Sequence, residues 1–154
     1  QTPIVMTTGQ RFGLNMLSAV SAKGLLRFMV AKGRVGGEQV CEFMRRLMYR
    51  AKRPIFLILD GHPMHKSRLV KQCEQSYGGK LRLFFLPPYS PELNPVEFVW
   101  TQMEEYLASR APQDIQQLVM LVRAALRRTR RSQARLWSCI YTSDLPWKRR
   151  IERH

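Results

Sequence analysis

The stretch IFLILDGHPMHKSRLVKQCEQSYGGKLRLFFL, residues 55–86, holds two short apolar runs separated by a polar segment. Continuous apolar runs such as 55–59 and 81–86 predict strands that are buried on both faces. The segment between them has apolar residues at helical spacing, namely Leu69, Val70, Cys73 and Tyr77. A strand, a helix and a second strand in this order are typical of an α/β protein.

The rest of the chain extends this pattern on both sides. Residues 14–22 and 25–33 are short and apolar-rich, and the Lys23-Gly24 turn between them predicts a β-hairpin. Apolar residues at helical spacing predict helices over three further segments, 38–51, about 95–108 and about 113–128. A hairpin followed by alternating strands and helices indicates an α/β fold with a mixed β-sheet flanked by α-helices.

The charge of the chain points to a polyanionic partner. The chain has 154 residues and a net charge of +15, so nucleic acid is the first partner to consider and an anionic membrane the second. No apolar run reaches membrane-spanning length, and residues 1–10 lack the pattern of a signal peptide. The three cysteines form no CxxC pair, which favours reduced thiols in a cytosolic protein over a structural zinc site.

The C-terminal third is the most basic region. Residues 110–154 hold eleven Arg or Lys against three acidic residues. Arginines near a helix end are also explained by solvation and by the helix dipole. The density of this cluster favours nucleic-acid contact, and the predicted contacts are Arg127, Arg128, Arg130 and Arg131.

Asp60 and Glu97 are the two carboxylates whose positions point to chemistry. Asp60 follows the strand at 55–59, where α/β proteins place ligand-binding groups, although Asp-Gly is equally a turn signal. Glu97 lies three residues after Asn94, so a helix capping box is a good alternative explanation for it. If the two strands are parallel, both carboxylates reach one edge of the sheet and form an oxygen-rich site suited to Mg²⁺ or Mn²⁺. Such ions bind phosphates and activate water or a 3′-hydroxyl for in-line attack.

The segment GHPMHKSRLVK, residues 61–71, lies between these carboxylates in the sequence. His62 and His65 stand three residues apart without a third soft ligand, so a structural or phosphate-contacting role is favoured over zinc binding. The cations that follow form either a solvated helix face or a set of phosphate contacts. A polyanion beside two acids requires cations, so DNA contacts are expected at His65, Lys66, Arg68 and Lys71.

Two motifs carry a resemblance to a known family. LILDGHPMHKS at 57–67 and LFFLPPYSPELNPVEFVW at 83–100 closely resemble the catalytic domain of IS630-type transposases in the Tc1/mariner superfamily. AVSAKG at 19–24 is similar to the hairpin of that family, and the resemblance covers roughly residues 1–108. The LPPYSPELNPVE block is long and unusual, which makes the resemblance specific.

The resemblance implies an RNase H-like fold with a DD(E/D) active site. Such a site binds two divalent metals, Mg²⁺ or Mn²⁺, hydrolyses a DNA phosphodiester and uses the freed 3′-hydroxyl to attack target DNA. Asp60 resembles the second acid of the site and Glu97 the third. The implied partners are transposon ends, target DNA and further copies of the chain. The implied location is the bacterial cytoplasm, in association with the nucleoid.

The first acid of the family pattern has no counterpart in this sequence. In the family it lies on the first strand, upstream of the region that matches QTPIVMTTGQ, and residues 1–37 contain no Asp or Glu. We therefore expect the first, central strand to be missing, which would leave unpaired strand edges in the sheet. Three explanations fit the missing acid. The chain is a fragment of a longer transposase, a downstream product that needs an upstream segment to supply the Asp and the strand, or a decayed remnant. Two carboxylates hold two metals poorly, so we expect the chain by itself to be weakly active or inactive.

The expected organisation is a partial catalytic domain over residues 1–110, with a basic helical extension over 111–154 packed on it or continuing it. The alternative to a transposase catalytic domain is a non-enzymatic DNA-binding remnant, in which the basic region supplies affinity. Another RNase H-like nuclease, such as a Holliday junction resolvase, is disfavoured by the LPPYSPELNP block.

Overall fold

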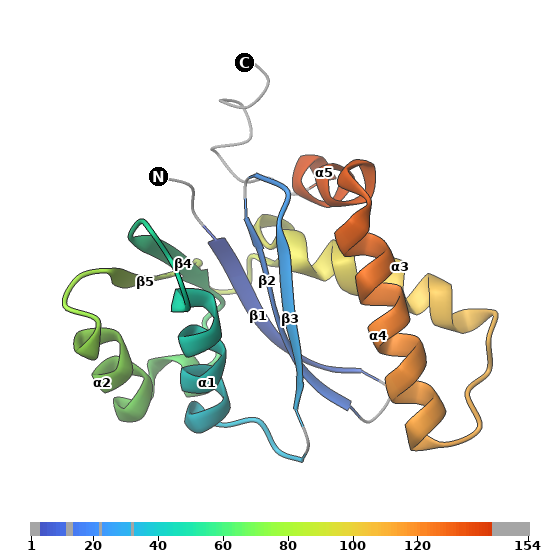
Figure 1. The fold of residues 1–154 in the computed structure, drawn as a ribbon, viewed down its shortest axis with the longest axis horizontal. Helices are drawn as coiled ribbons and strands as arrows, with labels where there is room; N and C mark the ends of the chain where they lie inside the picture. The colour runs from blue at the N-terminus through green and yellow to red at the C-terminus, as the bar shows by residue number, and fades with distance from the viewer. Residues whose placement is uncertain (1–3, 12–13, 22, 32, 143–154) are drawn as a thin grey trace.

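The computed structural model describes residues 4–11, 14–21, 23–31 and 33–142 (Figure 1). In these ranges the chain forms five strands and five helices, and the sequence predicts all of them except the strand at Ile4–Arg11 and the separate helix at Gln133–Thr142. Two short 3₁₀ turns, Pro63–Lys66 and Pro91–Leu93, precede α2 and α3. The strands are β1 (Ile4–Arg11), β2 (Leu14–Ser21), β3 (Leu26–Ala31), β4 (Ile55–Leu59) and β5 (Leu81–Phe85). The helices are α1 (Gly37–Met48), α2 (Arg68–Ser76), α3 (Pro95–Ala108), α4 (Ile115–Arg131) and α5 (Gln133–Thr142).

The strands form one mixed sheet in the order β3-β2-β1-β4-β5. β1, β2 and β3 are antiparallel neighbours, and β4 and β5 run parallel to β1. Parallel pairing of β4 with β5 brings the ends of both strands to the same edge, as the sequence analysis requires for Asp60 and Glu97. The predicted hairpin and the predicted mixed α/β class are both confirmed.

The centre of the sheet is occupied, so the prediction of a missing central strand is wrong. β1 pairs with β2 over eight residues and with β4 over three, from Ile4 beside Leu57 to Met6 beside Leu59. Four of its eight residues, Ile4, Val5, Thr7 and Thr8, are β-branched and favour an extended strand. The position immediately before the β2–β3 hairpin lets this segment fold back as the first strand of a meander.

Helices cover both faces of the sheet and create two separate cores. α1 and α2 pack on one face, around Val40, Phe43 and Val70. α3, α4 and α5 pack on the other face, where Trp100, Met103, Val122 and Leu126 are buried against β2 and β3 (Figure 1). In the ranges that the structure describes, no helix combines the length and the apolar character needed to cross a bilayer.

β5 lies at the edge of the sheet and is less buried than its apolar sequence predicts. Leu81 and Leu83 belong to the core beneath α1 and α2, whereas Phe84 on the opposite side of the strand is 46% exposed. On that side α3 and α4 contact β1, β2 and β3, which lie at the centre and the far edge of the sheet. The prediction that 81–86 is buried on both faces is therefore wrong.

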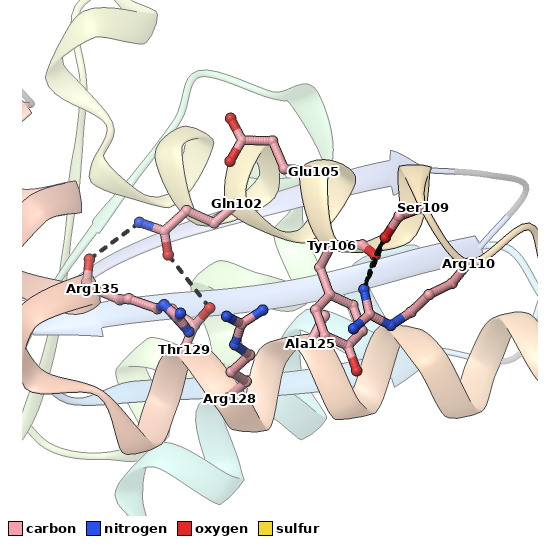
Figure 2. Close-up of a pocket in the computed structure, with 9 residues that line it drawn as sticks. All are labelled: Gln102, Glu105, Tyr106, Ser109, Arg110, Ala125, Arg128, Thr129 and Arg135. Atoms are coloured by element: carbon pink, nitrogen blue, oxygen red, sulfur yellow. Dashed lines mark hydrogen bonds between the residues drawn. The ribbon is translucent and has the colours of Figure 1, made fainter.

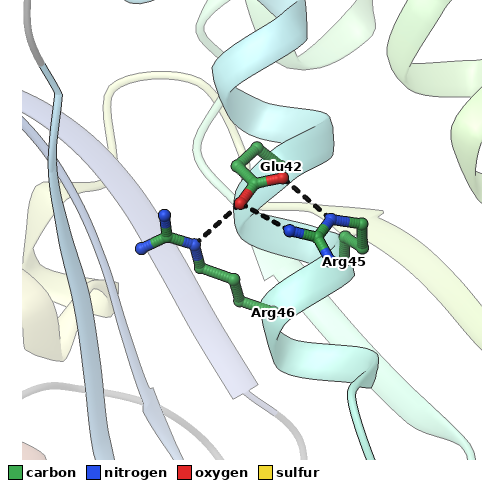
Figure 3. Close-up of polar contacts among 3 residues, drawn as sticks. All are labelled: Glu42, Arg45 and Arg46. Carbon is green, nitrogen blue, oxygen red and sulfur yellow. Dashed lines mark hydrogen bonds and ion pairs between the residues drawn. The ribbon is translucent and has the colours of Figure 1, made fainter.

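The surface of α1 carries an ion-pair cluster whose members all lie within the same helix. Glu42 accepts hydrogen bonds from Arg45 at 2.8 Å and from Arg46 at 2.9 Å, all within one turn (Figure 3). The hydrogen bonds from these two arginines lower the pKa of Glu42 to about 2. The three residues are solvent-accessible, so this cluster supports α1 itself rather than its packing on the sheet.

The last helix closes onto the turn of the β2–β3 hairpin. The side-chain amide of Gln133 donates to the carbonyl of Gly24 at 3.3 Å. Gly24 has a φ of +74°, and a Cβ at this position would lie 2.7 Å from the Gln133 Oε1 atom. Glycine is therefore required at this turn both by its backbone angle and by the close approach of α5.

Candidate active site

A cavity of about 490 Å³ lies at the carboxyl ends of β4 and β5. Asp60 enters it from the end of β4, and Glu97 enters it from the first turn of α3. His62, Lys66, Tyr89 and Asn94 also line it. The structure thus brings together the two carboxylates that the sequence singled out, at the edge where parallel sheets bind ligands.

Asp60 is held by the turn that follows it. Its Oδ1 atom accepts a hydrogen bond from the backbone N–H of His62 at 3.1 Å and lies 2.8 Å from Nδ1 of His65. The same ring nitrogen lies 3.2 Å from the backbone oxygen of Asp60. Both neighbours of Nδ1 are acceptors, so the proton of a neutral His65 ring belongs on Nδ1. Asp60 therefore acts as the turn residue and lines the cavity at once.

His65 is buried, with 1% of its surface exposed. At this depth the ring offers little surface to a DNA backbone, and the DNA contact at His65 stays a prediction. A structural role explains the burial of His65 better than a DNA contact does, because the ring N–H of His65 restricts the rotation of Asp60. The alternative of a structural role, which the sequence analysis also carried, is the one that the geometry favours.

Glu97 is positioned by the start of α3. Asn94 is 3% exposed, and its side-chain oxygen accepts a hydrogen bond from the N–H of Val96 at 3.1 Å. Its backbone oxygen accepts from the N–H of Glu97 at 3.2 Å, and Pro95 occupies the first helical position. Asn94 thus acts as the N-cap that the sequence predicts, while Glu97 lines the cavity one turn into the helix.

The proline-rich loop fixes the distance between β5 and α3. The N–H of Leu86 donates to the carbonyl of Leu59 at 2.8 Å, which is the last sheet bond before Pro87 and Pro88. Tyr89 then takes a φ of +56° and is fully exposed at the rim of the cavity. Prolines have no N–H to donate, so β5 ends here and the chain turns toward the helix.

The predicted cations divide into those near the carboxylates and those far from them. Lys66 lines the cavity, and its ammonium group lies 5.2 Å from the centre of the Phe85 ring. Arg68 and Lys71 are exposed on α2 and do not line the cavity. Three of the four arginines predicted from the C-terminal region, Arg127, Arg128 and Arg131, line a different cavity. The guanidinium group of Arg130 instead lies 5.4 Å from the ring centre of Phe28 on β3.

The strand that would carry a further acid has none. Met6 pairs with Leu59, so the next residues along the two parallel strands, Thr7 and Asp60, hold equivalent positions. β1 contains no Asp or Glu. Within the described ranges, no three His, Cys, Asp or Glu side chains gather in an arrangement that could hold a metal. The site therefore has two carboxylates where the family pattern has three acids.

Sequence reasoning counted Arg110 and Arg135 in the basic region but did not select them as DNA contacts, and the two line a cavity together with Arg128. Arg110 lies beyond α3 and Arg135 in the first turn of α5, so neither belongs to the dense arginine run of α4. Only the packing of three helices brings these positions together. Asn94 was identified from the sequence as a helix cap, and its place in the cavity lining was not predicted.

The comparisons with known proteins agree with this geometry. The family model for the DDE superfamily endonuclease matches residues 1–119. An uncharacterized protein of Sinorhizobium fredii, y4pE/y4sA, is 36% identical over 93 residues, which cover 60% of this chain and 56% of that protein. The match therefore spans little more than half the length of this relative.

Two solved structures share the fold. The catalytic core domain of BIV integrase superposes with a TM-score of 0.58 at 19% identity, over 82% of this chain and 78% of its own. A chain of the simian T-cell lymphotropic virus intasome, solved with the PP2A regulatory subunit B56 gamma, gives 0.59 at 14% identity, over 80% and 46%. Integrase catalytic cores have an RNase H-like fold, and this chain has the same fold. With the family match over most of its length, the chain belongs to the DDE superfamily of endonucleases.

Proposed function

We propose that this chain is the catalytic domain of a DNA transposase of the IS630 type, within the Tc1/mariner superfamily. The observation that carries the proposal is the shared cavity of Asp60 and Glu97 at the ends of two parallel strands, in a chain of the DDE superfamily. The LPPYSPELNPVE block supports the IS630 type in particular, because it resembles the corresponding block of that family. The same block forms the loop and helix start that place Glu97. The proposed substrates are transposon ends and target DNA, and the proposed assembly is a homo-oligomer in the bacterial cytoplasm, associated with the nucleoid.

The donor atoms of the cavity fit a hard divalent cation. Asp60 and Glu97 offer carboxylate oxygens, which Mg²⁺ and Mn²⁺ prefer, and the set contains no thiolate. A bound ion supplies positive charge to a phosphodiester and lowers the pKa of a water molecule or a 3′-hydroxyl. The role of His65 is then to hold Asp60 in one rotamer, and the role of Asn94 is to fix the helix turn that carries Glu97.

The cations near the cavity would hold the DNA. Lys66 lies on the cavity wall, where its charge offsets that of the two carboxylates when a phosphate approaches. Arg68 and Lys71 are exposed further along the same segment and are proposed to contact the DNA backbone outside the cavity. The basic region at 111–154 is proposed as an extension of the catalytic domain at 1–110 that adds further phosphate contacts.

Two carboxylates are fewer than two metal ions require, so we propose that the chain by itself is weakly active or inactive. An upstream segment or a partner is the proposed source of the remaining acid. A non-enzymatic DNA-binding remnant is the second candidate, and the lack of any Asp or Glu in residues 1–37 favours it. The two candidates differ in metal dependence, because a remnant binds DNA equally well in the presence of a chelator.

Manganese binding tests the proposed site directly. Electron paramagnetic resonance of Mn²⁺ titrated into the protein is expected to show a bound population that is lost in Asp60→Asn and in Glu97→Gln. Glu92→Gln is the matched control, because Glu92 is exposed in the same loop but does not line the cavity. Equal Mn²⁺ binding by all four proteins would remove the proposed site.

A DNA-nicking assay with Mn²⁺ measures the activity of the chain itself. Weak or absent cleavage is expected. Robust cleavage that disappears in Asp60→Ala would show that two carboxylates are sufficient and would contradict the need for a further acid.

A further inference from the structure

Two adjoining cavities lie between α3, α4 and α5, apart from the carboxylate cavity. The first measures about 310 Å³ and the second about 550 Å³, and Arg128 and Arg135 line both. Arg110 lines the first cavity, and Arg127 and Arg131 line the second. We call this pair of cavities the arginine groove (Figure 2 shows the first). It shares no residue with the cavity of Asp60 and Glu97.

In the described part of the chain, nearby acids leave the positive charge of the arginine groove largely unbalanced. Glu105 is the single carboxylate among the residues that line it. Figure 2 shows its carboxylate directed away from the guanidinium groups of Arg128 and Arg135. Among the described residues, no ion pair to a carboxylate is recorded for any of the five arginines. Burial raises the pKa of the Cys139 thiol to about 11, so this neighbour of Gln102 supplies no charge either.

Two of the guanidinium groups are held in place. Arg110 donates to the backbone oxygen of Tyr106 at 2.7 Å and to the hydroxyl of Ser109 at 3.1 Å. Its guanidinium carbon lies 3.6 Å from the centre of the Tyr106 ring, and that of Arg128 lies 5.5 Å from the same ring. One aromatic ring therefore contacts two like charges, an arrangement that an anion between them would stabilise.

The floor of the groove is a polar contact that joins three helices. Thr129 of α4 is 4% exposed and donates to the side-chain oxygen of Gln102 on α3 at 3.5 Å. The amide of Gln102 donates in turn to the backbone oxygen of Arg135 on α5 at 3.3 Å. Figure 2 shows both bonds of Gln102, to Arg135 and to Thr129. The half-buried Gln102 and the buried Thr129 thus help to set the relative positions of Arg128 and Arg135.

The helix dipole explains only part of this cluster. Arg128 and Arg131 lie in the last turn of α4, where the dipole stabilises cations. Arg135 lies in the first turn of α5, where the same effect disfavours a cation. A solvated helix end therefore accounts for Arg128 and Arg131 but not for Arg135 pointing into the groove beside them.

We propose that the arginine groove binds successive phosphate groups of a nucleic-acid strand, at a distance from the carboxylate site. Guanidinium groups match the oxygens of a phosphate in a two-bond geometry, and the two joined cavities offer room for more than one phosphate. The inference rests on the proposed function in one respect, that DNA is the polyanion. It does not depend on metal binding or cleavage.

The test measures DNA binding in a chelator, by fluorescence anisotropy with labelled single strands and duplexes of about 20 nucleotides. The groove variant is Arg128→Gln/Arg135→Gln. The matched control is Arg50→Gln/Arg53→Gln, which removes the same charge from exposed residues between α1 and β4 that line neither the groove nor the carboxylate cavity. The groove variant is expected to lose about tenfold in affinity and about two units of salt slope, and the control a small part of this.

Equal losses in the two double variants would overturn the proposal, because they would show a non-specific effect of net charge. Arg128→Lys/Arg135→Lys retains the charge and tests the two-bond geometry if the glutamine variant fails to fold. It is expected to bind more weakly than the parent, and unchanged binding would count against the groove.

A second arm separates a nucleic-acid strand from a free phosphate. Thermal denaturation is followed in inorganic phosphate and in chloride at matched ionic strength. Two results together would overturn the proposal in favour of a small-anion site. Phosphate would stabilise the parent but not the groove variant, and the groove variant would bind DNA as tightly as the parent. Loss of Mn²⁺ binding in Asp60→Asn with intact groove-dependent DNA binding would separate the two sites experimentally.

Discussion

The carboxylate cavity and the arginine groove use opposite ends of α3 and are built in different ways. Glu97 lies in the first turn of α3 and Tyr106 in the last, nine residues away, which corresponds to about 14 Å along the helix. The carboxylates are positioned by strand ends, a cap and a proline-rich loop, whereas the arginines are positioned by the packing of helices. Short sequence motifs therefore indicate the carboxylate cavity, whereas the arginine groove is visible only in the tertiary structure.

The largest expected effect is a loss of Mn²⁺ binding at the carboxylate cavity without a loss of DNA binding at the arginine groove. Asp60→Asn/Glu97→Gln should abolish detectable Mn²⁺ binding, because it removes both carboxylate ligands, while DNA affinity in chelator stays at the level of the parent. Electron paramagnetic resonance and anisotropy measure the two quantities on the same samples. A parallel loss of DNA binding would show that the two regions are one site.

His65 tests whether the carboxylate cavity depends on its buried support. His65→Ala removes the partner at 2.8 Å from Asp60 and should lower Mn²⁺ affinity by about tenfold. Cys73→Ala is the control, since Cys73 is half-buried on α2 and does not line the cavity. The measurement is a Mn²⁺ titration with circular dichroism to confirm folding, and equal effects of the two variants would argue against positioning by the buried ring.

Thr7 offers a way to complete the acid set. Thr7→Asp places a carboxylate at the β1 position equivalent to Asp60 and should raise Mn²⁺ affinity severalfold. Thr8→Asp is the matched control, because successive strand residues face opposite sides of the sheet. A larger gain with Thr8→Asp than with Thr7→Asp would show that the register of β1 against β4 differs from the one described.

Tyr106 tests the organisation of the arginine groove at smaller amplitude. Tyr106→Leu removes the ring that lies under Arg110 and near Arg128, and should weaken DNA binding about threefold without changing Mn²⁺ binding. The readout is the salt dependence of anisotropy. A threefold change with an unaltered salt slope fits a positioning role, whereas no change at all would mean that Arg110 and Arg128 act without the ring.

The smallest effect belongs to α1, outside both sites. The pKa of Glu42 is lowered to about 2 by Arg45 and Arg46, so its contribution to stability is present above the ordinary carboxyl pKa and declines as the pH falls through about 2. Glu42→Gln should therefore lower the melting temperature slightly at neutral pH and not at all at strongly acidic pH. Thermal denaturation across pH detects this, and an effect that grows toward low pH would contradict the sign.

Local pattern was sufficient for β2 to β5, for α1 to α4 and for singling out the two carboxylates that line the cavity. The apolar run 55–59 and the Asn94-Pro95 start of α3 were visible in the sequence, because strands and caps depend on neighbouring residues. β1 was missed because Thr7, Thr8 and Gly9 weaken its apolar pattern. Its stability comes instead from pairing with β2 and β4, which are distant in part from β1 in the sequence. The burial of His65 and the exposure of Phe84 depend on which strands lie at the edge of the sheet. The order of the strands cannot be predicted from the residues next to each position.

The contact between Gln133 and Gly24 has a consequence for the order of folding. It joins residues 109 positions apart, so it forms only after a large loop has closed, whereas the β1–β2–β3 meander is made of contacts close in sequence. The hairpin turn is therefore expected to exist before α5 can dock on it. Trp137 of α5 lies beside the same turn, so its fluorescence should report the last step of refolding rather than the first.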